Sequence, residues 1–138
     1  MYIYTHKVQY YETDQMQIVH HSNYIRWFEE ARCAVLASVD CGYDTVERMG
    51  IVSPVLGVNA EYKSMTRFGE TVNIETSVAL YNGFRLNVAY TIKDSETGEV
   101  RCIGETKHCF LDRDRKVVNL RKKAPEIHEK MMRLAAAQ

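Results

Sequence analysis

Apolar residues recur every three or four positions early in the chain and every second position through most of the remainder. The early segment, residues 23 to 39, is therefore predicted to be an amphipathic helix. Few charges interrupt its apolar face, which is typical of a helix packed against a sheet. The positions that define this face are Tyr24, Phe28, Ala31, Val35 and Val39.

Alternation of apolar and polar residues predicts four strands after this helix. Asn82-Gly83 separates the second from the third, and this dipeptide is a strong signal of a tight hairpin. Aromatic and β-branched residues predict one more strand before the helix. The five predicted strands cover residues 4 to 11, 56 to 62, 72 to 80, 84 to 92 and 100 to 111.

Two further helices are predicted, a short one over residues 43 to 49 and a terminal one that begins at Pro125. One central helix must then cover a whole antiparallel sheet. The expected fold class is α+β, with a curved sheet wrapped around that helix. The 138 residues fit a single domain, residues 1–138, without repeats or linkers.

Composition narrows the classes of function. Lysine and arginine together number 18, as do aspartate and glutamate, so no net charge favours nucleic acid or an anionic membrane as a partner. No apolar run approaches the roughly 20 residues of a membrane span. The first residues lack the features of a signal peptide, so a cytoplasmic location is expected. Cysteines and histidines show no metal-ligand spacing, so no metal or other cofactor is expected.

The segment between the first strand and the helix carries the most chemistry. Asp14 follows the predicted strand, and His20 and His21 come just before the helix. Unpaired N–H groups at a helix start can polarise a carbonyl and stabilise an oxyanion. A nearby carboxylate can activate a water or attack directly. These residue types therefore suit the hydrolysis of an acyl group.

Simpler interpretations of the same residues stay open. Asp14 is also a common turn residue, because its side chain can bond its own backbone. The two histidines could cap or line the loop, and Tyr24 could belong only to the core. Other catalytic classes find little support, since the chain has no G-x-S-x-G elbow and no glycine-rich phosphate loop.

The residues around this joint form a motif that combines residue type, spacing and predicted structure. An aromatic strand end and an acid are followed by a V-x-H loop, a tyrosine at the helix start and F-E-x-A-R. A second, weaker motif is Glu61-Tyr62 followed by Arg67. The residues of the first are Tyr10, Tyr11, Glu12, Thr13, Asp14, Val19, His21, Tyr24, Phe28, Glu29, Ala31 and Arg32.

In these motifs the chain resembles the hotdog-fold acyl-CoA thioesterases, specifically the 4-hydroxybenzoyl-CoA thioesterase branch that includes the Tol-Pal-associated enzymes. The resemblance covers roughly residues 4 to 120. It implies a hotdog fold, with a curved antiparallel five-stranded sheet around a central helix. It also implies an enzyme without cofactor that hydrolyses the thioester of an acyl-CoA or acyl-carrier protein. A homodimer or homotetramer with the site between two protomers is implied as well.

The resemblance carries residue roles to this chain. Asp14 matches the catalytic carboxylate, which acts as nucleophile or as general base. His21 matches the position whose backbone N–H points at the thioester carbonyl, and Tyr24 matches a residue that lines the site. Arg67 is the first candidate to bind the CoA phosphates, ahead of Arg85. A basic run, Arg121-Lys122-Lys123, is a further candidate, although such a run is usually a solvated surface.

The alternative function is a non-catalytic acyl-CoA or acyl-carrier binding module on the same fold, and a dehydratase is a third, weaker interpretation. A carboxylate at position 14 favours the enzyme, because a binding module has no need of it. The chain also departs from the family twice. Gln17 stands near a position where the family often has glycine, so we expect strain there if the turn needs a positive φ. Met65 stands where the family often has proline.

Overall fold

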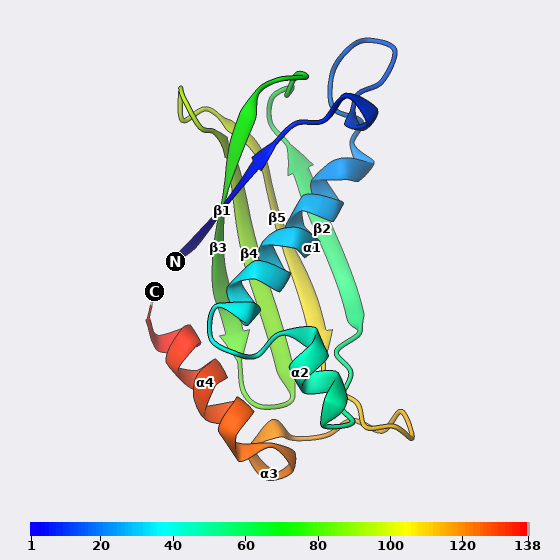
Figure 1. Cartoon of the computed structure of the whole chain (residues 1–138), viewed down its shortest axis with the longest axis vertical. Helices are drawn as coiled ribbons and strands as arrows, with labels where there is room; N and C mark the ends of the chain where they lie inside the picture. The colour runs from blue at the N-terminus through cyan, green and yellow to red at the C-terminus, as the bar shows by residue number, and fades with distance from the viewer. Residues whose placement is uncertain (138) are drawn as a thin grey trace.

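Five antiparallel strands form one sheet in the computed structural model, which describes residues 1–137, and the long helix α1 lies across one face of it (Figure 1). The order across the sheet is β1-β3-β4-β5-β2. The elements are β1 (Tyr2–Lys7), α1 (Ser22–Ala37), α2 (Tyr43–Arg48), β2 (Val55–Tyr62), β3 (Thr71–Tyr81), β4 (Arg85–Asp94), β5 (Val100–Cys109), α3 (Leu120–Lys123) and α4 (Pro125–Ala136), with a short 3₁₀ turn at Tyr10–Glu12. This arrangement confirms the predicted α+β class.

The predicted first strand is too long by four residues. β1 ends at Lys7, which pairs with Thr71 at the start of β3, and the chain beyond it has no neighbouring strand. Tyr10 and Tyr11 therefore lie in the 3₁₀ turn, where their side chains are 76% and 78% exposed. β-Prone residues formed no strand here because a strand needs a partner as well as a propensity.

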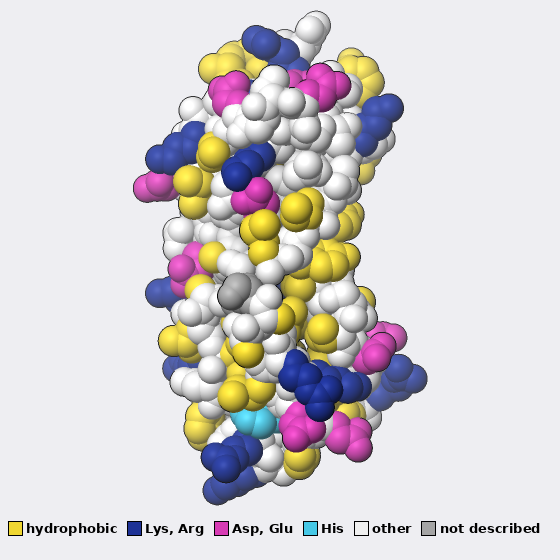
Figure 2. Space-filling view, turned by 90° about the vertical axis from the view of Figure 1, so that its left-hand side faces the viewer, with side chains coloured by type: hydrophobic (Ala, Val, Ile, Leu, Met, Phe, Trp, Pro, Cys, Tyr) yellow, Lys and Arg dark blue, Asp and Glu magenta, His cyan; other side chains and the backbone are white. Residues whose placement is uncertain are grey.

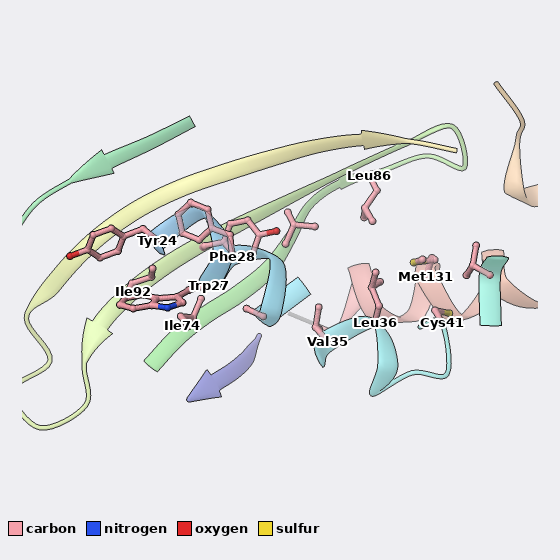
Figure 3. Close-up of a cluster of buried hydrophobic side chains, with 14 of the residues drawn as sticks. Tyr24, Trp27, Phe28, Val35, Leu36, Cys41, Ile74, Leu86, Ile92 and Met131 are labelled. Atoms are coloured by element: carbon pink, nitrogen blue, oxygen red, sulfur yellow. The ribbon is translucent and has the colours of Figure 1, made fainter. Parts of the chain in front are cut away.

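The core lies between α1 and the middle strands. Trp27 and Phe28 of α1 are fully buried, and the ring of Phe28 stacks on that of Tyr90 from β4 with centroids 4.4 Å apart. Figure 3 shows the rings of Trp27 and Phe28 between the helix and the sheet, with Ile74 and Ile92 beside Trp27. This packing fixes the helix over the sheet, and with it the position of the helix start.

The two ends of the molecule are built differently. The loop that leads from β1 into α1 lies at one end, and α3 and α4 close the other (Figure 1). Ile127 and Met131 of α4 are buried. Within the described residues, no helix is both long and apolar enough to cross a bilayer.

Helix α1 approaches the sheet closely at Gly104 of β5. A Cβ atom there would lie 2.5 Å from the backbone oxygen of Asn59 and 2.5 Å from the ring of Phe28. No side chain fits into that gap without moving the helix or the neighbouring strand.

Gly104→Ala is therefore expected to lower the free energy of unfolding by about 1–3 kcal/mol, because overpacking displaces the rings of the core. Urea denaturation of the purified variant measures this. Gly57→Ala is the matched control on the adjacent strand, since a Cβ there meets only the end of the Lys107 side chain at 3.9 Å. Equal stability of the two variants would contradict the close contact.

Candidate active site

A buried carboxylate, Glu12, organises the joint between β1 and α1. Its side chain is 4% exposed and accepts hydrogen bonds from Gln9 N–H at 2.7 Å, Trp27 Nε1 at 2.6 Å and His6 Nε2 at 2.8 Å. Burial raises the pKa of Glu12, but the bonds from Gln9, His6 and Trp27 outweigh it and leave the pKa below its ordinary value. The group is therefore a charged structural anchor.

The backbone of the same residue holds the start of α1. The carbonyl of Glu12 accepts from His20 N–H at 2.9 Å and from the side-chain amide of Asn23 at 2.9 Å. Asn23 therefore does not cap the helix through its side chain, and His21 occupies the N-cap position without a side-chain capping bond. Both ends of the intervening loop, residues 13 to 19, are thus fixed at one point.

The loop closes on itself through its own backbone. Asp14 N–H donates to Ile18 O at 2.9 Å, and Gln17 N–H donates to Asp14 O at 3.0 Å. Gln17 adopts φ of +63°, so the turn does use the positive φ for which strain was expected at this position. A left-handed conformation costs a non-glycine residue roughly 1–2 kcal/mol. The loop is a tight, hydrogen-bonded turn that carries Asp14.

A second turn, residues 63 to 70, supports this loop from outside. Thr66 accepts from Val19 N–H at 2.8 Å through its carbonyl and from Tyr24 OH at 3.0 Å through its hydroxyl. The backbone of Arg67 pairs with that of Ile18. The side chain of Arg67 is exposed and does not line the pocket described below.

Arg101 of β5 ties the second turn to the sheet. Its guanidinium lies 3.0 Å from a carboxylate oxygen of Glu70, 3.0 Å from one of Asp94 and 3.2 Å from Ser64 Oγ. Backbone N–H groups of Thr97 and Glu96, together with Arg101, hold the pKa of Asp94 well below its usual range. Sequence reasoning gave Arg101 no role, because its partners are spread along the chain.

A pocket of about 390 Å³ opens beside the start of α1. It brings together three of the four predicted site residues, Asp14, His21 and Tyr24. Its complete lining is Asp14, Ile18, Val19, His21, Tyr24, Tyr62, Lys63, Ser64 and Met65. Lys63 is a cation that the sequence analysis missed, although it directly follows the Glu61-Tyr62 motif.

The remaining predicted cations lie elsewhere. Arg85 begins β4 at the hairpin end of the sheet, and the N–H of Leu120 at the start of α3 donates to Gly83 in that same hairpin. The run at residues 121 to 123 therefore lies at the opposite end of the molecule from the pocket (Figure 1).

His21 contributes its backbone as well as its ring to the pocket. Among residues 1–137, no group accepts a hydrogen bond from its N–H, although its carbonyl accepts from Tyr62 OH at 3.3 Å. Its exposed ring lies on that of His20, with centroids 4.2 Å apart, and edge-on to Tyr62 at 6.1 Å. A free N–H at a helix start is the kind of donor that can stabilise an oxyanion.

Asp14 is half-buried and serves the turn with only one of its two oxygens. Oδ1 accepts from Met16 N–H at 2.8 Å, which is the turn role considered as the simpler interpretation. Within the described part of the chain, Oδ2 takes part in no hydrogen bond. Tyr24 is likewise both core and lining, being 4% exposed with the pKa of its hydroxyl raised mainly by burial. The site thus offers one free carboxylate oxygen and one free N–H.

Comparison with known proteins places this chain and its fold in a family. The sequence profile of the thioesterase-like superfamily matches residues 8–134. The chain belongs to this superfamily. It is therefore a thioester hydrolase with a hotdog fold, which confirms the predicted enzyme class and fold.

Individual relatives agree with this assignment. The chain is 36% identical over 123 residues to the putative acyl-CoA thioesterase YneP of Bacillus subtilis, covering 88% of each protein. It is similar to the crystal structure of a DHNA-CoA thioesterase from Staphylococcus aureus, with a TM-score of 0.90 and 32% identity over 97% of this chain and 90% of that one. A hypothetical protein from Aquifex aeolicus matches with a TM-score of 0.83 and 31% identity over 92% of this chain and 98% of that one.

Glu12→Gln is expected to lower the free energy of unfolding at pH 7 by about 1–3 kcal/mol. The NH2 group of the glutamine would face the N–H of Trp27 or of Gln9, and two donors cannot form a hydrogen bond with each other. The lowered pKa adds a pH dependence. The carboxylate contributes stability above its ordinary value of 4.5, and this contribution is lost as the pH falls through the lower pKa of the folded protein.

Urea denaturation at pH 7 and pH 3 measures both effects, and the gap between wild type and variant should narrow at pH 3. Glu29→Gln, which changes an exposed carboxylate on α1, is the control and should leave stability unchanged. A gap that stays the same at both pH values would show that Glu12 is not the charged anchor.

Proposed function

We propose that the protein is an acyl-CoA thioesterase that cleaves an acyl-CoA, or an acyl-carrier protein thioester, into free acid and thiol. The observation that carries this proposal is that Asp14 and His21 line one pocket, and that Oδ2 of Asp14 and the N–H of His21 have no hydrogen-bond partner within the described residues. The name of the Bacillus subtilis relative supports the substrate class. The residues shared at the joint favour the 4-hydroxybenzoyl-CoA thioesterase branch within the superfamily.

Two routes use this arrangement. In the first, a carboxylate oxygen of Asp14 bonds to the thioester carbon, the C–S bond breaks, the thiolate leaves and water hydrolyses the resulting anhydride. In the second, Asp14 takes a proton from a water whose oxygen attacks the same carbon, the C–S bond then breaks, and the leaving thiolate takes up the proton from Asp14. In both routes the N–H of His21 stabilises the charge that develops on the carbonyl oxygen.

The lining of the pocket favours an aromatic acyl group. The rings of Tyr24 and Tyr62 lie 5.4 Å apart, and that of His21 lies edge-on to Tyr62. Aromatic side chains arranged in this way pack well against a further ring. A panel of aromatic and aliphatic acyl-CoAs, including DHNA-CoA, read by thiol release, would identify the preferred acyl group.

Asp14→Asn is expected to reduce turnover on the best substrate by about a hundredfold to ten-thousandfold, because the charge is lost. The loop should keep its shape, since an asparagine oxygen can still accept from Met16 N–H. Thiol release under saturating substrate measures the loss, and Asp44→Asn on α2 is the control for an exposed aspartate. Near-normal turnover of Asp14→Asn would leave Asp14 a turn residue and favour the non-catalytic binding module.

We also propose that β2 pairs with β2 of a second copy. β2 bonds only to β5, so its outer edge has unpaired backbone groups. Its apolar side chains are exposed, with Leu56 at 50%, Val58 at 43% and Tyr62 at 49%. Because Tyr62 also lines the pocket, a partner on this edge would help to enclose the substrate. The other edge, β1, is shorter, and Figure 2 shows charged side chains spread among apolar ones on that side.

Light scattering should give a mass of at least about twice that of the 16.0 kDa chain. A tetramer would also agree with the proposal, because it can be built from two such dimers. Val58→Lys should shift the protein toward the monomer, because a charge on the edge opposes pairing. Ile3→Lys on β1, where the side chain is 51% exposed, is the matched control and should keep the mass of the wild type. A fully active wild-type monomer would refute the shared site.

A further inference from the structure

The end of the molecule opposite the pocket carries a surface rich in unpaired cations. Residues 112 to 123 contain six lysines and arginines against two aspartates, a net charge of +4 in a chain whose net charge is zero. All six cations are exposed, and none forms an ion pair among the described residues. We call this surface the basic face, and its members are Arg113, Arg115, Lys116, Arg121, Lys122 and Lys123.

The two segments of the basic face meet at the start of β2. A hollow of about 290 Å³ is lined by Arg113 from the turn after β5 and by Lys123 from α3, together with Arg48 at the end of α2. The turn after β5 adjoins the start of β2, because Leu111 pairs with Val52 three residues before that strand begins. Figure 1 shows this turn and α3 together at that end of the sheet.

The pocket lies at the other end of the same strand. β2 ends at Tyr62, which lines the pocket together with the next three residues, Lys63, Ser64 and Met65. A two-fold axis that continues the sheet from β2 into β2 of a second copy makes the two strands antiparallel. The start of β2 in one copy then faces the end of β2 in the other. Because such an axis stands perpendicular to the sheet, the helices of both copies remain on the same side.

With this symmetry, the basic face of each copy lies beside the pocket of the other. We infer that the basic face docks an acidic carrier protein whose thiol arm delivers the acyl group to that pocket. Six cations spread over a turn and a helix match a broad acidic protein surface, whereas the phosphates of a small carrier would leave most of them unused. The inference rests on the proposed thioesterase function and on the proposed pairing through β2.

The first test compares one acyl group on three carriers, N-acetylcysteamine, CoA and a holo acyl-carrier protein of net negative charge. Neutralising two cations, by Arg121→Gln with Lys122→Gln, should raise KM for the carrier-protein thioester about tenfold at low salt and leave kcat unchanged. The increase should shrink in high salt, because exposed charges are screened. KM for the other two thioesters should stay unchanged. Lys7→Gln with Arg26→Gln is the matched control, since both residues are exposed cations that line neither the pocket nor the basic face.

A mixed dimer decides which copy the basic face serves. One copy carries Asp14→Asn, the other carries Arg121→Gln with Lys122→Gln, and two different affinity tags isolate the hybrid. The intact Asp14 then lies in the copy with the neutralised basic face, and its pocket adjoins the intact basic face of the other copy. The hybrid should therefore recover the KM of the wild type at about half its turnover. A KM that stays about tenfold high would overturn the inference, because the basic face would then serve its own copy.

The choice of a protein ligand has its own contrary result. Equal increases in KM for the CoA and carrier-protein thioesters would overturn it, as would an equal increase in the Lys7→Gln Arg26→Gln control. Failure of the proposed function has a different signature, since the wild type would then release thiol from none of the three carriers. In that event calorimetry with the loaded carrier protein still tests the docking, and equal affinity of the wild type and the Arg121→Gln Lys122→Gln variant would overturn it.

Discussion

The geometry of the site depends on one buried carboxylate. Glu12 is nearly inaccessible to water, and a buried charge is stable only when hydrogen bonds replace its hydration. The donors come from three places, His6 in β1, Gln9 in the connection and Trp27 in α1. Because the Glu12 carbonyl also holds His20, the end of the strand and the start of the helix cannot move independently. The catalytic candidates, Asp14 and His21, are therefore attached to a rigid joint.

The loop that carries Asp14 receives its second support from a distant part of the chain. Arg101 on β5 binds Glu70, and Glu70 in turn accepts from the N–H of Arg67 at 2.5 Å. Thr66, in the same turn, holds both Val19 and the hydroxyl of Tyr24. A loop on its own is mobile, but this one lies between a buried anchor and a turn fixed to the sheet. Catalytic groups gain from such support, because small displacements of a reacting atom are costly.

Much of the fold follows from local signals. The helix at 23 to 39 and the later strands were predictable because hydrophobic periodicity is a property of neighbouring residues. The end of β1 was not, because it depends on where β3 begins, some 60 residues later in the chain. A compact motif predicted Asp14 and His21, which both line the pocket. Glu12 belongs to that motif, yet an acid beside two tyrosines gives no sign of burial, and Arg101 acts through contacts that only the folded sheet creates.

Two carboxylates only two residues apart therefore have separate tasks, and their surroundings explain which is which. Both oxygens of Glu12 are occupied, Oε1 by His6 and Gln9 and Oε2 by Trp27, so attack on a substrate would first break the joint. Asp14 is half-buried, uses one oxygen for its turn and lines the pocket beside the start of α1. Enzymes commonly assign different roles to paired acids by giving them different environments. Here the fully bonded acid holds the joint together, and the acid with a free oxygen is the one that we propose reacts.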